Sequence, residues 1–268
     1  LPPPPQHRVQ SNTPPSASQL SSLLSLPPPS VSSAALGLQH GHVLSAGTLY
    51  SWGKGERGQL GYFPAGGNCC FAVPVVRGVE AGGEWREVGE LDRLAAGFNH
   101  GAAGKRGETG AWLWGKNMGV DGDSGRPRDL YLPVWFPLPS PLAGLACCSH
   151  QTFAVCEDGS VHGHGIYRGG GGAVTEAFVE VRPPSSERVE VFGGHEAHAV
   201  VNGTEVRRLE LDAGDLLVGE GELEDGEEFV PHVREAEWME GVELGGREIK
   251  AVHSGWEFGM VEMEEVTR

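Results

Sequence analysis

The chain has 268 residues, including 42 glycines and 19 prolines, and carries a formal charge of −16 at pH 7. This length fits one large or two small all-β domains, and so much glycine and proline disfavours a helical protein. No apolar run reaches the roughly 18 residues of a membrane-spanning helix, and the acidic balance disfavours direct nucleic-acid binding.

The first 34 residues are rich in proline and serine, and no acidic residue precedes Glu56. Such a segment buries too little apolar surface to offset its ordering entropy, so residues 1–34 are predicted to be a disordered tail. Their composition is also that of an organellar transit peptide, although Arg8 is their single basic residue. The remaining residues, 35–268, are predicted to form one repeat domain.

Short strand-like units, each bounded by glycine, recur along this domain. They span residues 47–61, 111–117, 159–165 and 203–209. A second kind of marker lies before each unit, at residues 37–40, 97–100, 147–150 and 193–195, and a fifth such marker lies at 255–258. Gly53, Gly115 and Gly165 are separated by 62 and 50 residues, a period typical of propeller blades. The predicted fold is therefore all-β, a partial or divergent β-propeller of four to five repeat units.

Strand-like stretches also lie between these markers, at residues 72–76, 134–138 and 179–181. Each is short and bounded by glycine, proline or aspartate, as the strands of a propeller blade are. No segment shows a helical stripe over three turns.

The string from Trp52 to Gly61, WGKGERGQLG, resembles the signature of the regulator-of-chromosome-condensation repeat. The upstream Gly-x-x-His marker is similar to the same family. The resemblance implies structural roles for the signature residues, namely Trp52, Gly53, Gly58, Gln59, Leu60, Gly61, His100, Trp114, Gly115, His150 and Gly165. In that family seven blades usually close a ring, so the ring here would be shortened, cut or completed by another chain.

Histidines near one repeat are the strongest candidates for a metal site. His162 and His164 alternate on one strand, with His150 and Cys156 close in sequence. The repeat alignment gives a simpler account, because His164 stands where the other units have tryptophan and His150 stands at the histidine marker. We therefore predict no metal site and no cofactor.

No catalytic constellation emerges from the sequence. There is no Gly-x-Ser-x-Gly elbow, and the glycine run 169–172 is not followed by the Lys-Ser/Thr pair of a P-loop. The acidic run 220–228 lacks the ligand spacing of an EF-hand. We therefore predict that the chain is not an enzyme.

The acidic residues gather at the C-terminal end. From Thr204 to Arg268 the chain has 19 acidic residues against 6 basic ones. This excess indicates either a basic partner protein or a solvated acidic surface. The five cysteines, an odd number with no CxxC pair, favour a reducing compartment, so cytoplasmic or nuclear localisation is expected before an organellar one.

Three functions are compatible with the resemblance. The first is a non-enzymatic, protein-binding scaffold. The strings at 146–155, 191–204 and 255–258 are similar in spacing to a fungal member that partners a small metal-binding protein in diphthamide synthesis and Elongator-dependent tRNA modification. The second is guanine-nucleotide exchange on a Ran-like small GTPase, which is the activity of the family's founder. The third is an organellar repeat protein.

Overall fold

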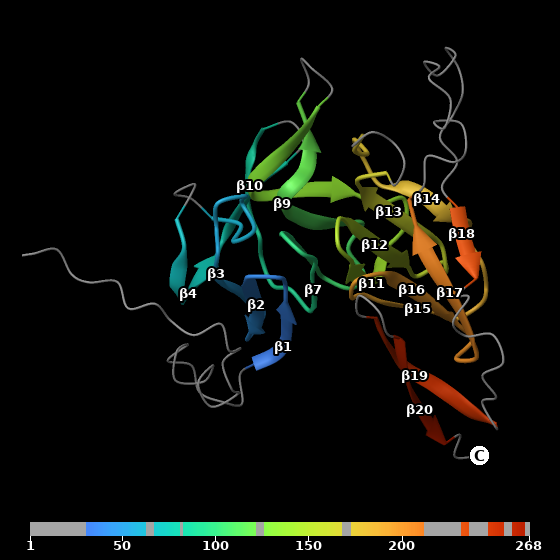
Figure 1. Cartoon of the computed structure of the whole chain (residues 1–268). Helices are drawn as coiled ribbons and strands as arrows, with labels where there is room; N and C mark the ends of the chain where they lie inside the picture. The colour runs from blue at the N-terminus through green and yellow to red at the C-terminus, as the bar shows by residue number, and fades with distance from the viewer. Residues whose placement is uncertain are drawn as a thin grey trace, which may run out of the picture.

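The computed structural model describes residues 31–62, 67–80, 83–121, 126–167, 173–211, 232–235, 246–254 and 259–265. All regular structure in these ranges is β, and the sheets follow one another in an arc from the blue N-terminal blade to the red C-terminal hairpin (Figure 1). None of the residues described forms a helix that could span a bilayer. The all-β prediction is confirmed.

The arc consists of five sheets, which we call blades 1 to 5. Blade 1 contains β1 (Val31–Leu36), β2 (His40–Ser45), β3 (Thr48–Gly53) and β4 (Cys69–Val75). Blade 2 contains β5 (Arg77–Glu80), β6 (Trp85–Glu87), β7 (Arg93–Ala96), β8 (His100–Gly104), β9 (Gly110–Val120) and β10 (Pro127–Pro137). Blade 3 contains β11 (Leu142–Cys147), β12 (Gln151–Cys156), β13 (Val161–Gly165) and β14 (Val179–Arg182). Blade 4 contains β15 (Val189–Phe192), β16 (Ala197–Val201), β17 (Glu205–Glu210) and β18 (His232–Glu235), and blade 5 contains β19 (Arg247–Ser254) and β20 (Gly259–Glu265).

Strand order explains how the blades form a propeller. Within blades 1, 3 and 4 the strands pair antiparallel in chain order. Strands β1, β7, β11, β15 and β19, one from each successive blade, contact one another in that sequence. They line the inner side of the arc, and we call each the first strand of its blade, although in blade 2 the hairpin of β5 and β6 precedes β7 in the chain. The strands that pair onward from them lie farther out.

Alternation along the middle strands supplies the core. On β9, Trp112 and Trp114 face blade 1 and pack with Leu44 and Leu49, whereas Leu113 packs on the other face. Neighbouring residues of a strand point to opposite faces of the sheet, so one strand contributes to two interfaces between blades. Both tryptophans and Leu113 are at most 1% exposed. Stacking of blades, rather than any one sheet, therefore provides the hydrophobic core.

The sheet of blade 2 has six strands, two more than those of blades 1, 3 and 4. The linker after blade 1 forms a hairpin of β5 and β6, and β5 pairs in parallel with β10 on the outer side of the blade. The order of this sheet is β6-β5-β10-β9-β8-β7. The connection between blades 1 and 2 thus adds strands to the blade that follows it.

The start of the propeller lies before the predicted boundary. Strand β1 begins at Val31, so the division between residues 34 and 35 falls inside a paired strand. Residues 1–30 of the predicted tail lie outside the described residues. The glycine run 169–172, the acidic run 220–228 and the marker 255–258 also lie outside them.

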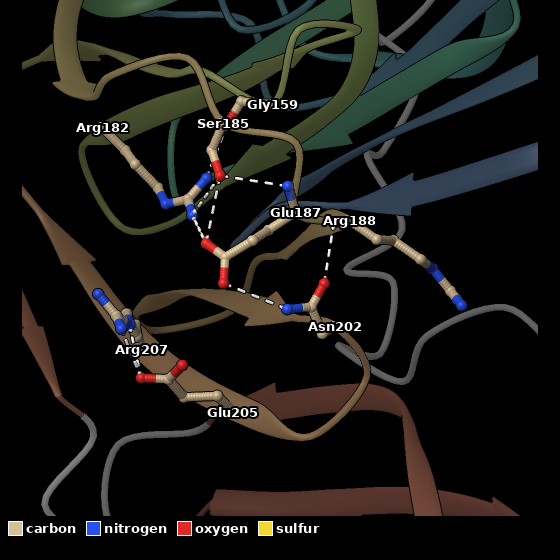
Figure 2. A network of polar contacts seen from close by, with 8 residues as sticks. All are labelled: Gly159, Arg182, Ser185, Glu187, Arg188, Asn202, Glu205 and Arg207. Atoms are coloured by element: carbon tan, nitrogen blue, oxygen red, sulfur yellow. Dashed lines mark hydrogen bonds and ion pairs between the residues drawn. The ribbon is translucent and has the colours of Figure 1, made fainter.

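A polar network joins blades 3 and 4 (Figure 2). The Arg182 guanidinium donates to the Gly159 carbonyl at 2.9 Å and to the Ser185 hydroxyl at 3.3 Å, and it pairs with the Glu187 carboxylate. Glu187 in turn accepts a 3.2 Å hydrogen bond from the Asn202 amide of blade 4. The network fixes the segment that leads from one blade to the next.

Candidate functional site

The signature string forms a loop that fastens blade 1 to blade 2. Gln59 is fully buried, and its carbonyl oxygen accepts a 3.0 Å hydrogen bond from the Trp114 indole. Gly58 has φ +79°, and a Cβ built there would lie 2.3 Å from the Leu130 carbonyl oxygen of blade 2. Leu60 is also buried, and Gly61 packs on the Trp114 ring. These residues hold blades together.

Three glycines repeat one backbone arrangement. Gly53, Gly115 and Gly165 have φ angles of +103°, +110° and +135°. A Cβ on each would lie 2.4 to 2.5 Å from the carbonyl oxygen of the residue just before the second strand of its blade, which is Gln39, Asn99 or His150 respectively. The same carbonyls accept backbone hydrogen bonds from residues 54, 116 and 166. Glycine is required at each of these three positions, because φ is positive and because a Cβ would clash with the carbonyl oxygen.

The histidine markers of blades 1 and 2 fill the space that their glycines leave. A Cβ on Gly37 or Gly97 would lie 2.0 Å from the ring of His40 or His100. His40 Nε2 lies 3.3 Å from the His100 carbonyl oxygen, a hydrogen bond from blade 1 to blade 2. Burial lowers the pKa of His40 to about 4 and that of His100 to about 3, so both rings are neutral at pH 7.

In blade 3 the prediction for His150 was wrong. Gln151, not His150, pairs with Gly165 as His40 pairs with Gly53 and His100 with Gly115. The Gln151 amide donates to the Ile166 and Leu211 carbonyls at 2.7 and 3.0 Å, while its oxygen accepts from the Leu211 N–H at 3.2 Å. His150 is exposed and lies one residue earlier. An amide therefore replaces the imidazole as the bridge to the next blade.

The other two histidines of blade 3, His162 and His164, have separate surroundings. His164 pairs with Thr152 in the register where the tryptophans pair with Gly41 and Gly101, so it takes the place of tryptophan. Its ring packs on Phe136, with centroids 4.4 Å apart, while His162 lies 3.0 Å from the Ser160 hydroxyl. Among the described residues no three His, Cys, Asp or Glu side chains form a metal-binding group.

The paired cysteines are held as thiols. Burial raises the pKa of Cys147 to about 12 and that of Cys148 to about 11. The thiolate is the reactive form, so these residues are poor nucleophiles at neutral pH. Cys147 lies 3.3 Å from the Thr152 hydroxyl and contributes to the packing between blades 2 and 3.

A row of backbone hydrogen bonds links the loops between the first and second strands of successive blades. The Leu38 N–H donates to the Phe98 carbonyl at 3.1 Å, Phe98 to Ser149 at 3.3 Å, Ser149 to His195 at 3.4 Å, and His195 to Ser254 at 3.0 Å. These residues belong to five consecutive blades. The row holds the loops of one face of the propeller at fixed positions relative to one another.

Two cavities lie beside this row. One, of about 480 Å³, is lined by small or apolar residues at the ends of β1, β7, β11 and β15 and in the loops that follow them. The other, of about 380 Å³, lies over blades 3 and 4, and we call it the face pocket. Its lining includes Phe98, His150, Tyr167, Glu196, Arg208 and Glu210.

Rings and charges converge in the face pocket. Phe98 contacts His150 and His195, with ring centroids 5.9 and 5.6 Å apart. Arg208 on β17 pairs with Glu196 at 2.9 Å and with Glu210 at 3.4 Å. The sequence alone marks neither carboxylate nor Phe98 as functional, because they lie in separate loops and strands of blades 2 and 4. The available signal was the position of Phe98 inside a repeat marker.

Comparison with known proteins finds a likeness in structure alone. No protein-family model matches the sequence, and no curated protein matches it significantly. The crystal structure of human WBSCR16 matches with a TM-score of 0.61 and 18% identity, over 88% of this chain and 58% of that one. Yeast RCC1 (Prp20), solved bound to Kap60, matches with a TM-score of 0.59 and 18% identity, over 88% and 54%. Prp20p of Saccharomyces cerevisiae, described with its binding to Gsp1p and histones, matches at 0.55 and 16%, over 88% and 56%.

The chain spans a little over half the length of these proteins. At such identities the likeness shows the fold, which agrees with the signature loop, the repeated glycines and the order of the strands. The chain therefore has a β-propeller fold, similar in structure to WBSCR16 and Prp20.

Proposed function

We propose that the chain is a non-enzymatic, protein-binding scaffold whose partner binds the loop face that carries the face pocket. The observation that carries this proposal is the hydrogen-bonded row from Leu38 to Ser254, which fixes the loops of five blades. A preordered surface loses little conformational entropy on binding, so it suits recognition of a protein.

The division of roles among residues supports the proposal. The described signature residues Gly58, Gln59, Leu60 and Trp114 are buried between blades. The side chains that reach the loop face, including Phe98 and His150, vary from blade to blade. Loops on a rigid scaffold are where binding residues usually lie.

The cellular role that we propose is accessory to wobble-uridine modification of tRNA and to diphthamide synthesis, with a small metal-binding protein as the partner. It rests on the spacing of the strings at 146–155 and 191–204. Cytoplasmic localisation accords with this role.

Guanine-nucleotide exchange on a Ran-like small GTPase is the second candidate. It is favoured by the likeness to Prp20p, the protein described with its binding to Gsp1p. Exchange predicts faster nucleotide release from the GTPase, whereas a scaffold leaves the release rate unchanged.

The test is affinity capture with the full chain, the F98A variant and the W85A variant as baits, with mass spectrometry of the retained proteins. Phe98 lies on the loop face, whereas Trp85, which is 65% exposed on β6, serves as the control. We expect a partner that binds the wild type and W85A but is lost with F98A. A small metal-binding protein would support the tRNA role, and a nucleotide-sensitive GTPase would support exchange. Equal recovery with all three baits would contradict the proposed surface.

A further inference from the structure

We propose that Asn202 is a deamidation site, that the polar network between blades 3 and 4 restrains its reaction, and that the product loosens this network. The inference goes beyond the scaffold function and does not depend on it. Asparagine deamidates when the backbone nitrogen of the next residue attacks its side-chain carbonyl carbon. Glycine in that next position hinders the attack least, because it has no side chain. Asn202, which Gly203 follows, is the only asparagine of the chain with a glycine after it.

The reaction consumes only water. The Gly203 backbone nitrogen forms a bond to the Asn202 Cγ and loses its proton, while the bond from Cγ to the side-chain nitrogen breaks and ammonia leaves with that proton. Water then opens the resulting succinimide ring at one of its two carbonyl carbons. One opening gives aspartate, and the other gives isoaspartate, in which the main chain runs through the former side chain. Each product carries a negative charge that asparagine lacks.

The reacting pair forms the turn between β16 and β17. Asn202 and Gly203 have φ of +52° and +72°, and the Thr204 N–H closes the turn with a 3.1 Å hydrogen bond to the Val201 carbonyl. The Asn-Gly pair suits such a turn, because both residue types tolerate positive φ. Asn202 is exposed, so water has access to its amide.

Two hydrogen bonds hold the Asn202 amide in place (Figure 2). Its nitrogen donates to the Glu187 carboxylate at 3.2 Å, and its oxygen accepts from the Arg188 N–H at 3.1 Å. Ring closure brings the Asn202 Cγ onto the Gly203 nitrogen, and these two bonds resist that movement. Deamidation should therefore be slow while the contact with Glu187 is intact, and faster when it is lost.

The product removes the contact that held the amide. In aspartate an oxygen replaces the amide nitrogen, so a second carboxylate faces that of Glu187 in place of a hydrogen-bond donor. Two carboxylates so close repel each other. Glu187 also pairs with Arg182 of β14, so the repulsion acts on the segment that leads from blade 3 to blade 4.

Isoaspartate would also disturb the contact with blade 5. The Gly203 carbonyl accepts a 2.7 Å hydrogen bond from the Ile249 N–H of β19, and a Cβ on Gly203 would lie 3.0 Å from the Glu248 carboxylate. The main chain of isoaspartate is longer by one carbon atom, which moves this carbonyl in a closely packed place. The site thus lies where three consecutive blades meet.

The first experiment follows the purified full chain during incubation at neutral pH, with peptide mapping by mass spectrometry. Asn117 is the internal control, because its φ of +58° is also positive but methionine follows it. We expect the carboxylate products to form at Asn202 at least about ten-fold faster than at Asn117. No product at Asn202 in the folded chain, or equal rates at the two asparagines, would overturn the proposal.

A pair of variants tests the restraint. E187A removes the acceptor of the Asn202 amide, whereas E190A removes a nearby carboxylate that pairs with Arg188. We expect E187A to raise the rate at Asn202 by about three-fold or more and E190A to leave it unchanged. Equal rates in the wild type and E187A would contradict the restraint. Circular dichroism reports whether each variant is folded.

The N202D variant tests the effect of the product. At low salt we expect it to melt at least about 2 °C below the wild type. The difference should shrink at high salt, because salt screens repulsion between exposed carboxylates. A melting temperature equal to that of the wild type at low salt would contradict the claim that deamidation loosens the network.

Discussion

The Trp114 indole N–H of blade 2 donates a 3.0 Å hydrogen bond to the Gln59 carbonyl in the signature loop of blade 1. Trp114 has no exposed surface, whereas Trp52, at the same position of blade 1, is half-buried. The signature of one repeat thus covers the tryptophan of the next repeat. This relationship gives the signature a physical role, because it joins repeats that cannot bury both their faces alone.

Replacement of Trp114 should therefore destabilise the fold more than replacement of Trp52. W114A leaves a buried cavity and an unpaired Gln59 carbonyl, so the free energy of unfolding should fall by about 3 to 5 kcal/mol. W52A should cost less than half as much, since its side chain is partly solvated already. Urea unfolding followed by circular dichroism measures both, and equal losses would contradict the role of the signature loop.

Substitution of Gly58 should cost more than substitution of a glycine that shares its φ alone. Gly58 and Gly107 have φ of +79° and +83°, but a Cβ at Gly107 meets nothing within 4 Å. G107A should thus lose about 1 kcal/mol through backbone strain. G58A also drives a Cβ into the Leu130 carbonyl and should lose more than about 3 kcal/mol in the same assay. Similar losses of unfolding free energy in G58A and G107A would show that the positive φ, and not the clash with Leu130, requires glycine at position 58.

Gln151, rather than His150, should be sensitive to mutation. Q151L removes both hydrogen bonds to Leu211 and the one to Ile166, which leaves buried backbone groups unpaired at a cost of about 1 to 3 kcal/mol. H150A alters an exposed side chain and should change the free energy of unfolding by less than about 0.5 kcal/mol. The opposite ranking would restore His150 as the marker residue of blade 3.

Acid should destabilise the propeller through its buried histidines. Burial lowers the pKa of His164 to about 3 and that of His198 to about 4, from 6.5 in the unfolded chain. The unfolded chain therefore binds more protons between these values, so stability is greatest above pH 6.5 and falls as the pH drops toward 4. Each histidine contributes a slope of up to about 1.4 kcal/mol per pH unit in that window.

The H164F variant isolates one of these contributions. Its ring still packs beside Phe136 but cannot take up a proton in the unfolded chain. The free energy of unfolding, measured by urea from pH 7 to pH 4.5, should depend on pH less steeply than in the wild type, by about one proton. An unchanged slope would show that His164 is not neutralised by burial.

The class of fold could be predicted from the sequence, because glycine-bounded strand units recur at spacings of 62 and 50 residues. Gly53, Gly115 and Gly165, which the repeat pattern marks, have positive φ and close backbone contacts that disfavour any other residue there. The exchange of His150 for Gln151 was not foreseen, because histidine and glutamine are neighbours and the register depends on pairing across strands. The hairpin of β5 and β6 was missed for a related reason, as its parallel pairing with β10 joins segments about 55 residues apart.

The face pocket could not be predicted from the sequence. Phe98 lies in the loop before β8, Glu196 in the loop before β16 and Arg208 on β17, and only Phe98 lies inside a repeat marker. Their convergence depends on the stacking of blades and on the row of loop hydrogen bonds. Repeats predict the scaffold, whereas the residues that differ between repeats form the site.

The most direct test of the central claim is hydrogen–deuterium exchange of the full chain, alone and with its captured partner. The account predicts slowed exchange in the loops at residues 97–99, 148–150 and 194–196, with the outer strands β4, β10 and β14 unchanged. Protection confined to the outer strands, with these three loops unaffected, would contradict the claim that the loop face binds the partner.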